Sequence, residues 1–150
     1  MNIDIEKIKQ RFSEINEAMN EIKKLVSISP DEFWKDKRNI AALKYYLILM
    51  IEAVGSVCTH ILAKKFNRAV STLSECFEFM EKEGILNKNL TERLKNISKF
   101  RNKLIHRYWE IEDELILKTY FKICKRRYKW FFWFYERDWK IYYKRRIKEE

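Results

Sequence analysis

Apolar residues recur at alternating intervals of three and four along the start of the chain, the spacing that places side chains on one face of an α-helix. The series predicts a first helix of about six turns. Its members are Ile5, Ile8, Phe12, Ile15, Met19, Ile22 and Val26. This heptad-like seam is narrow, so it suits packing along another long helix, either in the same chain or across a dimer.

A second helical series runs from about Asp36 to Lys65 and carries a broad apolar face. The face comprises Ile40, Leu43, Leu47, Met50, Ile51, Val54, Cys58 and Ile61. Ser29 and Pro30 precede it with a helix-start signal, because Ser is a favoured N-cap and Pro a favoured first residue. We expect the helix over 36–65 to be the most buried element.

Two polar residues within this central helix have alternative interpretations. Glu52 is either the partner of a cation in a functional site or, as we favour from the sequence, an edge residue that reaches water. His60 is either a second catalytic group or a structural histidine with a satisfied hydrogen bond. Base rates favour the structural role.

Capping signals delimit the following helices. Thr72 and Glu75 form a capping box that opens a helix, and Gly84 is a natural stop after it. Asn89 or Thr91 then begins another helix. Its apolar positions are Leu90, Leu94, Ile97, Leu104 and Tyr108. The gap in that series falls on Arg101, and an inward-facing arginine is costly unless an anion meets it.

The last predicted helix follows an acidic group that suits a helix N-terminus, made of Glu110, Glu112, Asp113 and Glu114. Between Tyr128 and Tyr143, ten of sixteen residues are aromatic, and they fall all round the helix. One intramolecular face cannot cover them. We expect an aromatic and basic extension over about 128–150. We rank its possible roles in this order: widening a dimer seam, stacking on bases, docking a protein partner and touching a membrane surface.

Composition agrees with a wholly helical chain. Only two Gly and one Pro occur among 150 residues, too few for the turns of a β-rich or α/β fold. We therefore predict an all-α fold of about five helices in one domain spanning 1–150. The three cysteines form no CxxC unit, so neither a disulfide framework nor a zinc site is indicated.

The net charge of +10 is unevenly distributed. The last 33 residues, from Lys118 to Glu150, contain twelve Lys or Arg and four Asp or Glu. A basic stripe is the usual footprint of a polyanion such as RNA, although a solvated helix face explains charge alone equally well. The N-terminus has no signal-peptide pattern, and no uncharged apolar run approaches the ~18 residues of a membrane span. We expect a soluble, cytoplasmic protein with no membrane span.

The segment from Arg101 to Tyr108 combines groups suited to phosphodiester cleavage. Arg101 offers a donor fork to phosphate oxygens, and His106 titrates near neutrality and can move a proton. Asn102 lies four residues before His106 and shares its face, whereas Arg101 and His106 are about 140° apart around the helix. Metal-free RNA cleavage benefits from both a base and an acid, so a symmetric dimer that pairs two copies is a mechanistic expectation.

Arg101–Tyr108 has the pattern Arg-x4-His-x-Tyr, which resembles the signature of the HepT-like toxins of the HEPN superfamily. The similarity extends over about Arg38 to Leu117. It includes Thr59-His60-Ile61, Phe77…Gly84-Ile85-Leu86 and Phe100–His106. The chain departs from the family pattern at 66–71, which lacks the expected proline, and beyond about Trp130.

The resemblance implies an antiparallel helical bundle that forms a homodimer with a composite cleft. It implies a metal-independent endoribonuclease toxin that needs no cofactor, cleaves tRNA or mRNA rather than a specific DNA, and is neutralised by a minimal nucleotidyltransferase antitoxin. Carried over by position, Arg101, His106 and Asn102 would be catalytic, and Tyr108 would be the tyrosine that the antitoxin adenylylates.

We add Lys99, Lys103 and Arg107 as weaker RNA-binding candidates on the same segment. Two alternatives remain open. The domain could be a non-catalytic nucleotide- or RNA-binding regulatory partner of a nucleotidyltransferase. It could also be a structural protein that assembles through its aromatic extension.

Overall fold

The computed structural model describes residues 2–116, and all their regular structure is helical, which confirms the all-α prediction for this part of the chain. The chain divides into two compact units, residues 1–110 and 111–150. In the second unit, residues 113–116 are helical, so this helix begins within the predicted acidic group, at Asp113, rather than after it. The predicted aromatic extension at about 128–150 and the rest of that helix lie outside the described residues.

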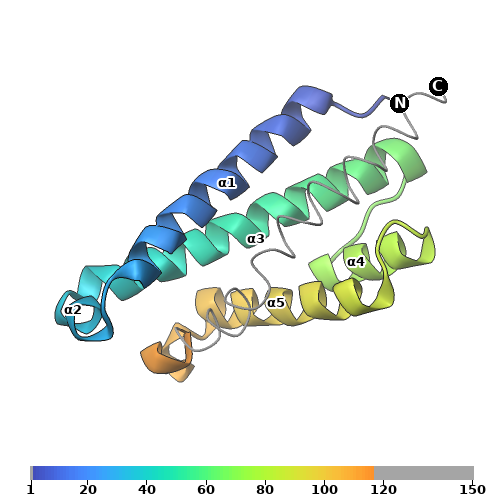
Figure 1. The fold of residues 1–150 in the computed structure, drawn as a ribbon. Coiled ribbons are helices and arrows are strands. Elements are labelled where there is room, and N and C mark those ends of the chain that lie inside the picture. The colour runs from blue at the N-terminus through green and yellow to red at the C-terminus, as the bar shows by residue number, and fades with distance from the viewer. Residues whose placement is uncertain (1, 117–150) are drawn as a thin grey trace. The chain divides into compact units, whose positions relative to one another are not determined.

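The first unit is built on three long helices that run in alternating directions (Figure 1). These are α1 (Ile5–Ser27), α3 (Lys37–Phe66) and α5 (Lys88–His106). Both α1 and α5 pack against α3, which lies between them. The shorter helices are α2 (Pro30–Lys35), which leads into α3, and α4 (Leu73–Lys82), which packs against α3 and α5. A 3₁₀ turn, η1 (Tyr108–Glu110), follows α5.

Burial on several sides explains why α3 is apolar over most of its length. Its buried residues include Leu43, Leu47, Ile51, Val57 and Ile61. Among the described residues α3 is the one helix long and apolar enough to cross a membrane by length and composition, because Glu52 alone interrupts its apolar centre. More than half of that apolar window is buried inside the protein, as in the core helix of a helical bundle.

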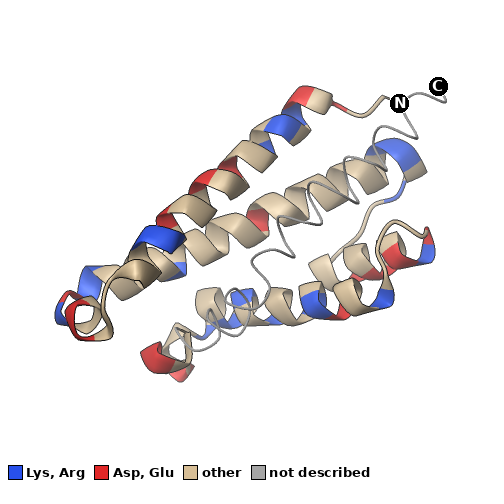
Figure 2. Ribbon diagram, viewed as in Figure 1, with Lys and Arg blue, Asp and Glu red and all other residues tan. Residues whose placement is uncertain are grey.

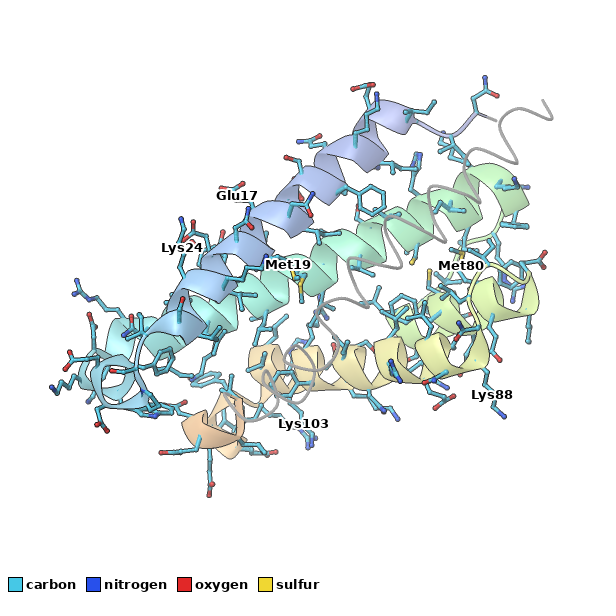
Figure 3. The ribbon with its side chains drawn as sticks, viewed as in Figure 1. Glu17, Met19, Lys24, Met80, Lys88 and Lys103 are labelled. Carbon is cyan, nitrogen blue, oxygen red and sulfur yellow. The ribbon has the colours of Figure 1, made fainter. Side chains whose placement is uncertain are left out.

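The heptad seam of α1 packs along α3, which confirms the prediction of a long helical partner within the chain. Ile8, Ile15, Met19 and Ile22 are buried. Figure 3 shows Met19 between the two helices, whereas Glu17 and Lys24 extend outward. This packing fixes α1 on the side of α3 opposite to α5.

Side-chain caps set the helix starts. Ser29 accepts from the Glu32 N–H, and Thr72 accepts from the Glu75 N–H at 3.1 Å, so both predicted caps are confirmed. The predicted start of α5 at Asn89 or Thr91 is wrong, because Asn87 Oδ1 caps the helix by accepting from the Leu90 N–H at 2.8 Å. The Asn87 side chain thus satisfies one of the backbone donors that would otherwise be left free at that end.

The connection from α3 to α4 turns without a proline. Asn67 adopts a left-handed conformation (φ 48°, ψ 43°), which asparagine tolerates better than most residues. The Arg68 guanidinium carbon then lies 4.2 Å from the centre of the Phe79 ring, and Phe66 packs edge-on against the same ring. These contacts tie the connection to α4 and fix where α4 begins.

His60 has the structural role favoured by the sequence. Its Nε2 accepts a hydrogen bond of 3.0 Å from the backbone N–H of Asp4, the N-cap of α1, and the ring is buried. Burial, and then the positive charge of Lys7, lower the pKa of His60 from its ordinary value, against an opposing contribution from Asp4. The neutral ring therefore links α3 to the start of α1.

Acidification should weaken this link. Because the pKa of His60 is lower in the folded protein than in the unfolded chain, its contribution to stability is complete above about pH 6.5 and is lost as the pH falls through the folded value. Urea unfolding between pH 8 and pH 5 measures the effect. His60→Gln retains an acceptor that does not titrate, so its stability should fall less over this range. Parallel pH profiles for the two proteins would contradict the assignment.

Candidate functional site

Arg101 lies on the inward side of α5, as the gap in the apolar series indicated. Its side chain is only 23% exposed. Its Nη2 pairs with the carboxylate of Glu52 on α3, and its Nη1 donates to Asn102 Oδ1 at 2.8 Å. Its Nε is buried and has no hydrogen-bond partner among the described residues. The guanidinium is thus held in one orientation, and Nη1 and Nη2, which carry two protons each, each retain one for a further acceptor.

Glu52 supplies the anion that the inward arginine required. The sequence-based preference for Glu52 as an edge residue that reaches water is wrong in one respect, because the carboxylate pairs with Arg101 although 48% of the side chain is exposed. Figure 2 shows a single acidic turn near the middle of α3, and Glu52 is the only acidic residue of that helix. The Glu52 side chain is therefore half-exposed and also paired with one specific cation, Arg101.

A pocket of about 330 Å³ lies beside Arg101. Residues 70–74, from the turn before α4 and its first residues, form one wall, and Thr59 of α3 contributes to the lining. Ser98, Arg101 and Asn102 of α5 also line it. Sequence reasoning identified Arg101 and Asn102 but missed the hydroxyl side chains, because isolated Ser and Thr residues far apart in sequence produce no periodic signal.

His106 does not line this pocket. It is the last residue of α5 and is exposed, as are Lys99, Asn102 and Lys103. Figure 3 shows Lys103 extending from α5 on the side away from α3. Since Arg101 and His106 both belong to α5, their expected separation of about 140° around the helix holds. One copy of the first unit thus presents Arg101 at the pocket and His106 on the outer face of the same helix.

Tyr108 lies beyond the helix, so the prediction that it is one of the apolar positions of α5 is wrong. The helix ends at His106, with Arg107 as its C-cap, and Tyr108 belongs to η1. The Glu110 N–H donates to the Arg107 carbonyl at 2.9 Å, and an ion pair of 3.7 Å joins the side chains of the same two residues. Tyr108 is 61% exposed and meets Trp109 edge to face. Its hydroxyl is therefore carried on an accessible turn.

No group of three His, Cys, Asp or Glu side chains within residues 2–116 is arranged to hold a metal ion. Cys58 and Cys76 are buried free thiols, and Cys124 lies outside the described residues. Contact with the Cys76 thiol and burial both raise the pKa of Cys58, so this thiol is neutral and unreactive.

The arrangement of these side chains suits the binding of a phosphodiester. Arg101 can donate to phosphate oxygens, and the exposed face from Lys99 to His106 adds positive charge and an imidazole. Because His106 is five residues from Arg101, the imidazole and the guanidinium fall on different faces of one helix.

Comparison with known proteins agrees with this chemistry. A protein of Archaeoglobus fulgidus named "Putative RNase" is 27% identical over 114 residues, which cover 76% of this chain and 80% of that protein. The tRNA nuclease HepT of Aphanizomenon flos-aquae is 28% identical over 115 residues, covering 77% and 78% of the two chains. The family model described as Ribonuclease HepT-like matches residues 15–126, a span that includes Glu52, the pocket and the whole Arg101–Tyr108 segment. With most of its length matched, the chain belongs to the HepT-like ribonuclease family.

Proposed function

We propose that the protein is a metal-independent endoribonuclease toxin that cleaves tRNA or mRNA at a composite site formed by two copies of α5. The observation that carries the proposal is the inward Arg101, oriented by Glu52 and Asn102 beside a pocket, five residues before an exposed histidine. An inward arginine costs free energy of burial, and such departures from the apolar pattern tend to occur at functional sites.

In the proposed reaction, Arg101 binds the scissile phosphate and stabilises the charge that develops on it. His106 of one copy removes the proton from the ribose 2′-hydroxyl, whose oxygen forms a bond to phosphorus. The bond from phosphorus to the 5′-oxygen breaks, and His106 of the second copy protonates that oxygen. The products carry 2′,3′-cyclic phosphate and 5′-hydroxyl ends. Asn102 holds the phosphate through its amide, and Lys99, Lys103 and Arg107 attract the flanking backbone.

The exposure of His106 and its distance around the helix from Arg101 support a homodimer. Each copy places its arginine on one side of α5 and its histidine on another, so two α5 helices facing each other would bring both kinds of group to one phosphate. The cytoplasm remains the predicted compartment, and two buried free thiols fit its reducing conditions.

His106→Ala tests the reaction directly. Cleavage of total tRNA in EDTA should fall by roughly 10²–10⁴-fold, because general acid–base catalysis typically contributes this much. Chelation should leave the wild-type rate unchanged, and the product ends can be identified by their resistance or susceptibility to phosphatase and kinase. Asn96→Ala, an exposed substitution on the same helix, is the matched control. Equal rates for His106→Ala and wild type would refute the proposal.

Glu52 is proposed as a positioning residue for Arg101. Glu52→Gln keeps an acceptor oxygen, so kcat should stay within about threefold of wild type. Glu52→Ala frees the guanidinium and should lower kcat by about tenfold or more, with little change in KM. Since the pair is partly exposed, its loss should cost about 1 kcal/mol or less in stability. Higher activity in either variant would mean that Glu52 competes with phosphate for Arg101.

The proposed partner is a minimal nucleotidyltransferase antitoxin that transfers AMP from ATP to the Tyr108 hydroxyl and releases pyrophosphate. The exposure of Tyr108 supports access by such an enzyme, and its place two residues after His106 would put the added phosphate and base beside the catalytic histidine.

Tyr108→Phe should abolish AMP incorporation from labelled ATP in the presence of the nucleotidyltransferase, and should also abolish neutralisation by modification. Tyr45→Phe is the matched control, because Tyr45 on α3 is 59% exposed. Intact-protein mass spectrometry measures the number of AMP groups. Incorporation that persists in Tyr108→Phe would place the modification elsewhere.

A second candidate is a non-catalytic regulatory partner of a nucleotidyltransferase that holds RNA or a nucleotide. The pocket beside Arg101 supports it, because about 330 Å³ is within the range of pockets that bind small ligands. RNA binding by the wild-type protein without cleavage under any of these conditions would favour this function.

A further inference from the structure

The pocket beside Arg101 is lined by both apolar and polar side chains. Val70 and Leu73 supply the apolar surface. Thr59, Thr72, Ser74 and Ser98 supply hydroxyl groups from three different segments of the chain. Such a mixture is typical of sites that hold an aromatic ring by its faces and recognise its polar edge.

The hydrogen bonds already made within the pocket decide what each group can still offer. Ser98 donates to the Lys95 carbonyl at 2.8 Å, so in its 3.3 Å contact with Ser74 it is Ser74 that donates. Thr59 likewise donates to the Gly55 carbonyl at 2.9 Å. Because a hydroxyl has a single proton, Ser74 and Thr59 can only accept from a ligand.

Other groups in the pocket remain donors. Thr72 Oγ1 accepts from the Glu75 N–H, which leaves its proton available. Asn102 Oδ1 accepts from Arg101, which leaves the amide NH₂ available. The pocket therefore offers donors and acceptors together, and this is the pattern that the edge of a nucleobase complements.

The charge around the pocket favours a neutral ring over a second phosphate. Glu52 neutralises one side of the Arg101 guanidinium. Glu75 brings a second carboxylate to the start of α4, where it accepts from the Ser71 N–H at 2.9 Å. Because the guanidinium that lines the pocket is already paired with Glu52, and Glu75 bonds to the backbone of the lining residue Ser71, the pocket attracts a further anion less than a free arginine would.

We propose that this pocket receives the base of one unpaired RNA nucleotide next to the phosphate that Arg101 binds, and that it sets the base preference of cleavage. The inference rests on the proposed ribonuclease function, because it takes Arg101 as the phosphate contact. Arg101 lines the pocket and so limits the distance between base and phosphate to about one nucleotide. Recognition of a base within an unpaired stretch is the usual route to sequence preference in RNA binding.

The absence of a side chain at Gly55 lets Leu73, which lines the pocket, pack close to α3. A Cβ at this position of α3 would lie 2.5 Å from Leu73 Cδ2, the far end of a flexible side chain that lines the pocket. Gly55→Ala would therefore push the Leu73 side chain aside and change the apolar wall, at little cost to the backbone.

The test uses the full chain and single-stranded oligoribonucleotides in which A, C, G or U occupies each position beside the scissile phosphate. Wild type should prefer one base at one position. Ser74→Ala removes an acceptor. It should lower kcat/KM for the preferred base by about 5- to 10-fold and leave kcat/KM for the other bases unchanged. Gly55→Ala should shift the preference between purines and pyrimidines. Ser13→Ala, an exposed serine on α1, is the matched control.

Absence of any base preference in wild type, or identical preferences in wild type, Ser74→Ala and Gly55→Ala, would overturn the pocket assignment. Unfolding midpoints measured alongside show that each variant is folded. If wild type cleaves none of the oligonucleotides, the proposed function fails but the pocket is still tested. In that case fluorescence anisotropy with the same oligonucleotides should show an affinity that depends on the base, and Ser74→Ala should reduce this dependence. Equal affinities for all four bases would refute the pocket assignment.

A free nucleoside monophosphate carries the same base without the flanking RNA. Comparing its affinity with that of the oligonucleotide shows whether the pocket takes RNA or a small molecule. The four monophosphates should bind at least tenfold more weakly than the preferred oligonucleotide, because flanking phosphates contribute to RNA binding. Equal affinity for a monophosphate and the oligonucleotide would identify the free nucleotide, rather than RNA, as the ligand.

Discussion

The ion pair between Arg101 and Glu52 is the interaction on which the functional end of the molecule depends. Glu52 supplies the anion that an inward guanidinium needs, and the pair orients Arg101 against α3, although partial exposure keeps its contribution to stability small. Because Glu52 occupies one side of the arginine and Asn102 another, the remaining donors face a restricted set of directions. One contact between α3 and α5 therefore fixes the orientation of the arginine that lines the pocket.

Much of the first unit follows from local signals in the sequence. The heptad seam of α1, the caps at Ser29 and Thr72 and the left-handed Gly84 (φ 71°) after α4 are short-range features, so pattern reasoning found them. The end of α5 was missed because Tyr108 continues the apolar spacing, and the sequence has no Gly or Pro there to stop a helix. The backbone turns at Arg107, and Tyr108 becomes an exposed residue of a separate turn.

The site could be predicted only in part, for a related physical reason. The irregular position of Arg101 was visible on one helix, but its partner lies 49 residues away on another, and only the fold identifies it. The pocket is still less visible, because it depends on the close approach of Leu73 to Gly55 and on hydroxyl groups from separate segments. Ser and Thr are common surface residues, so nothing marks those that the fold brings together.

His106 lies in the last turn of α5, so it is held less firmly than Arg101. From Ile105 to Glu110 every side chain is exposed, and the segment is held mainly by short-range bonds such as that from the Arg107 N–H to the Lys103 carbonyl. Arg101 lies one and a half turns earlier and is anchored to α3. Fraying of the helix end would thus displace the imidazole while the guanidinium stays in place, at a free-energy cost well below that of global unfolding. Any molecule that covers this end would stiffen it, so binding at this end and the ordering of the His106 imidazole are thermodynamically linked.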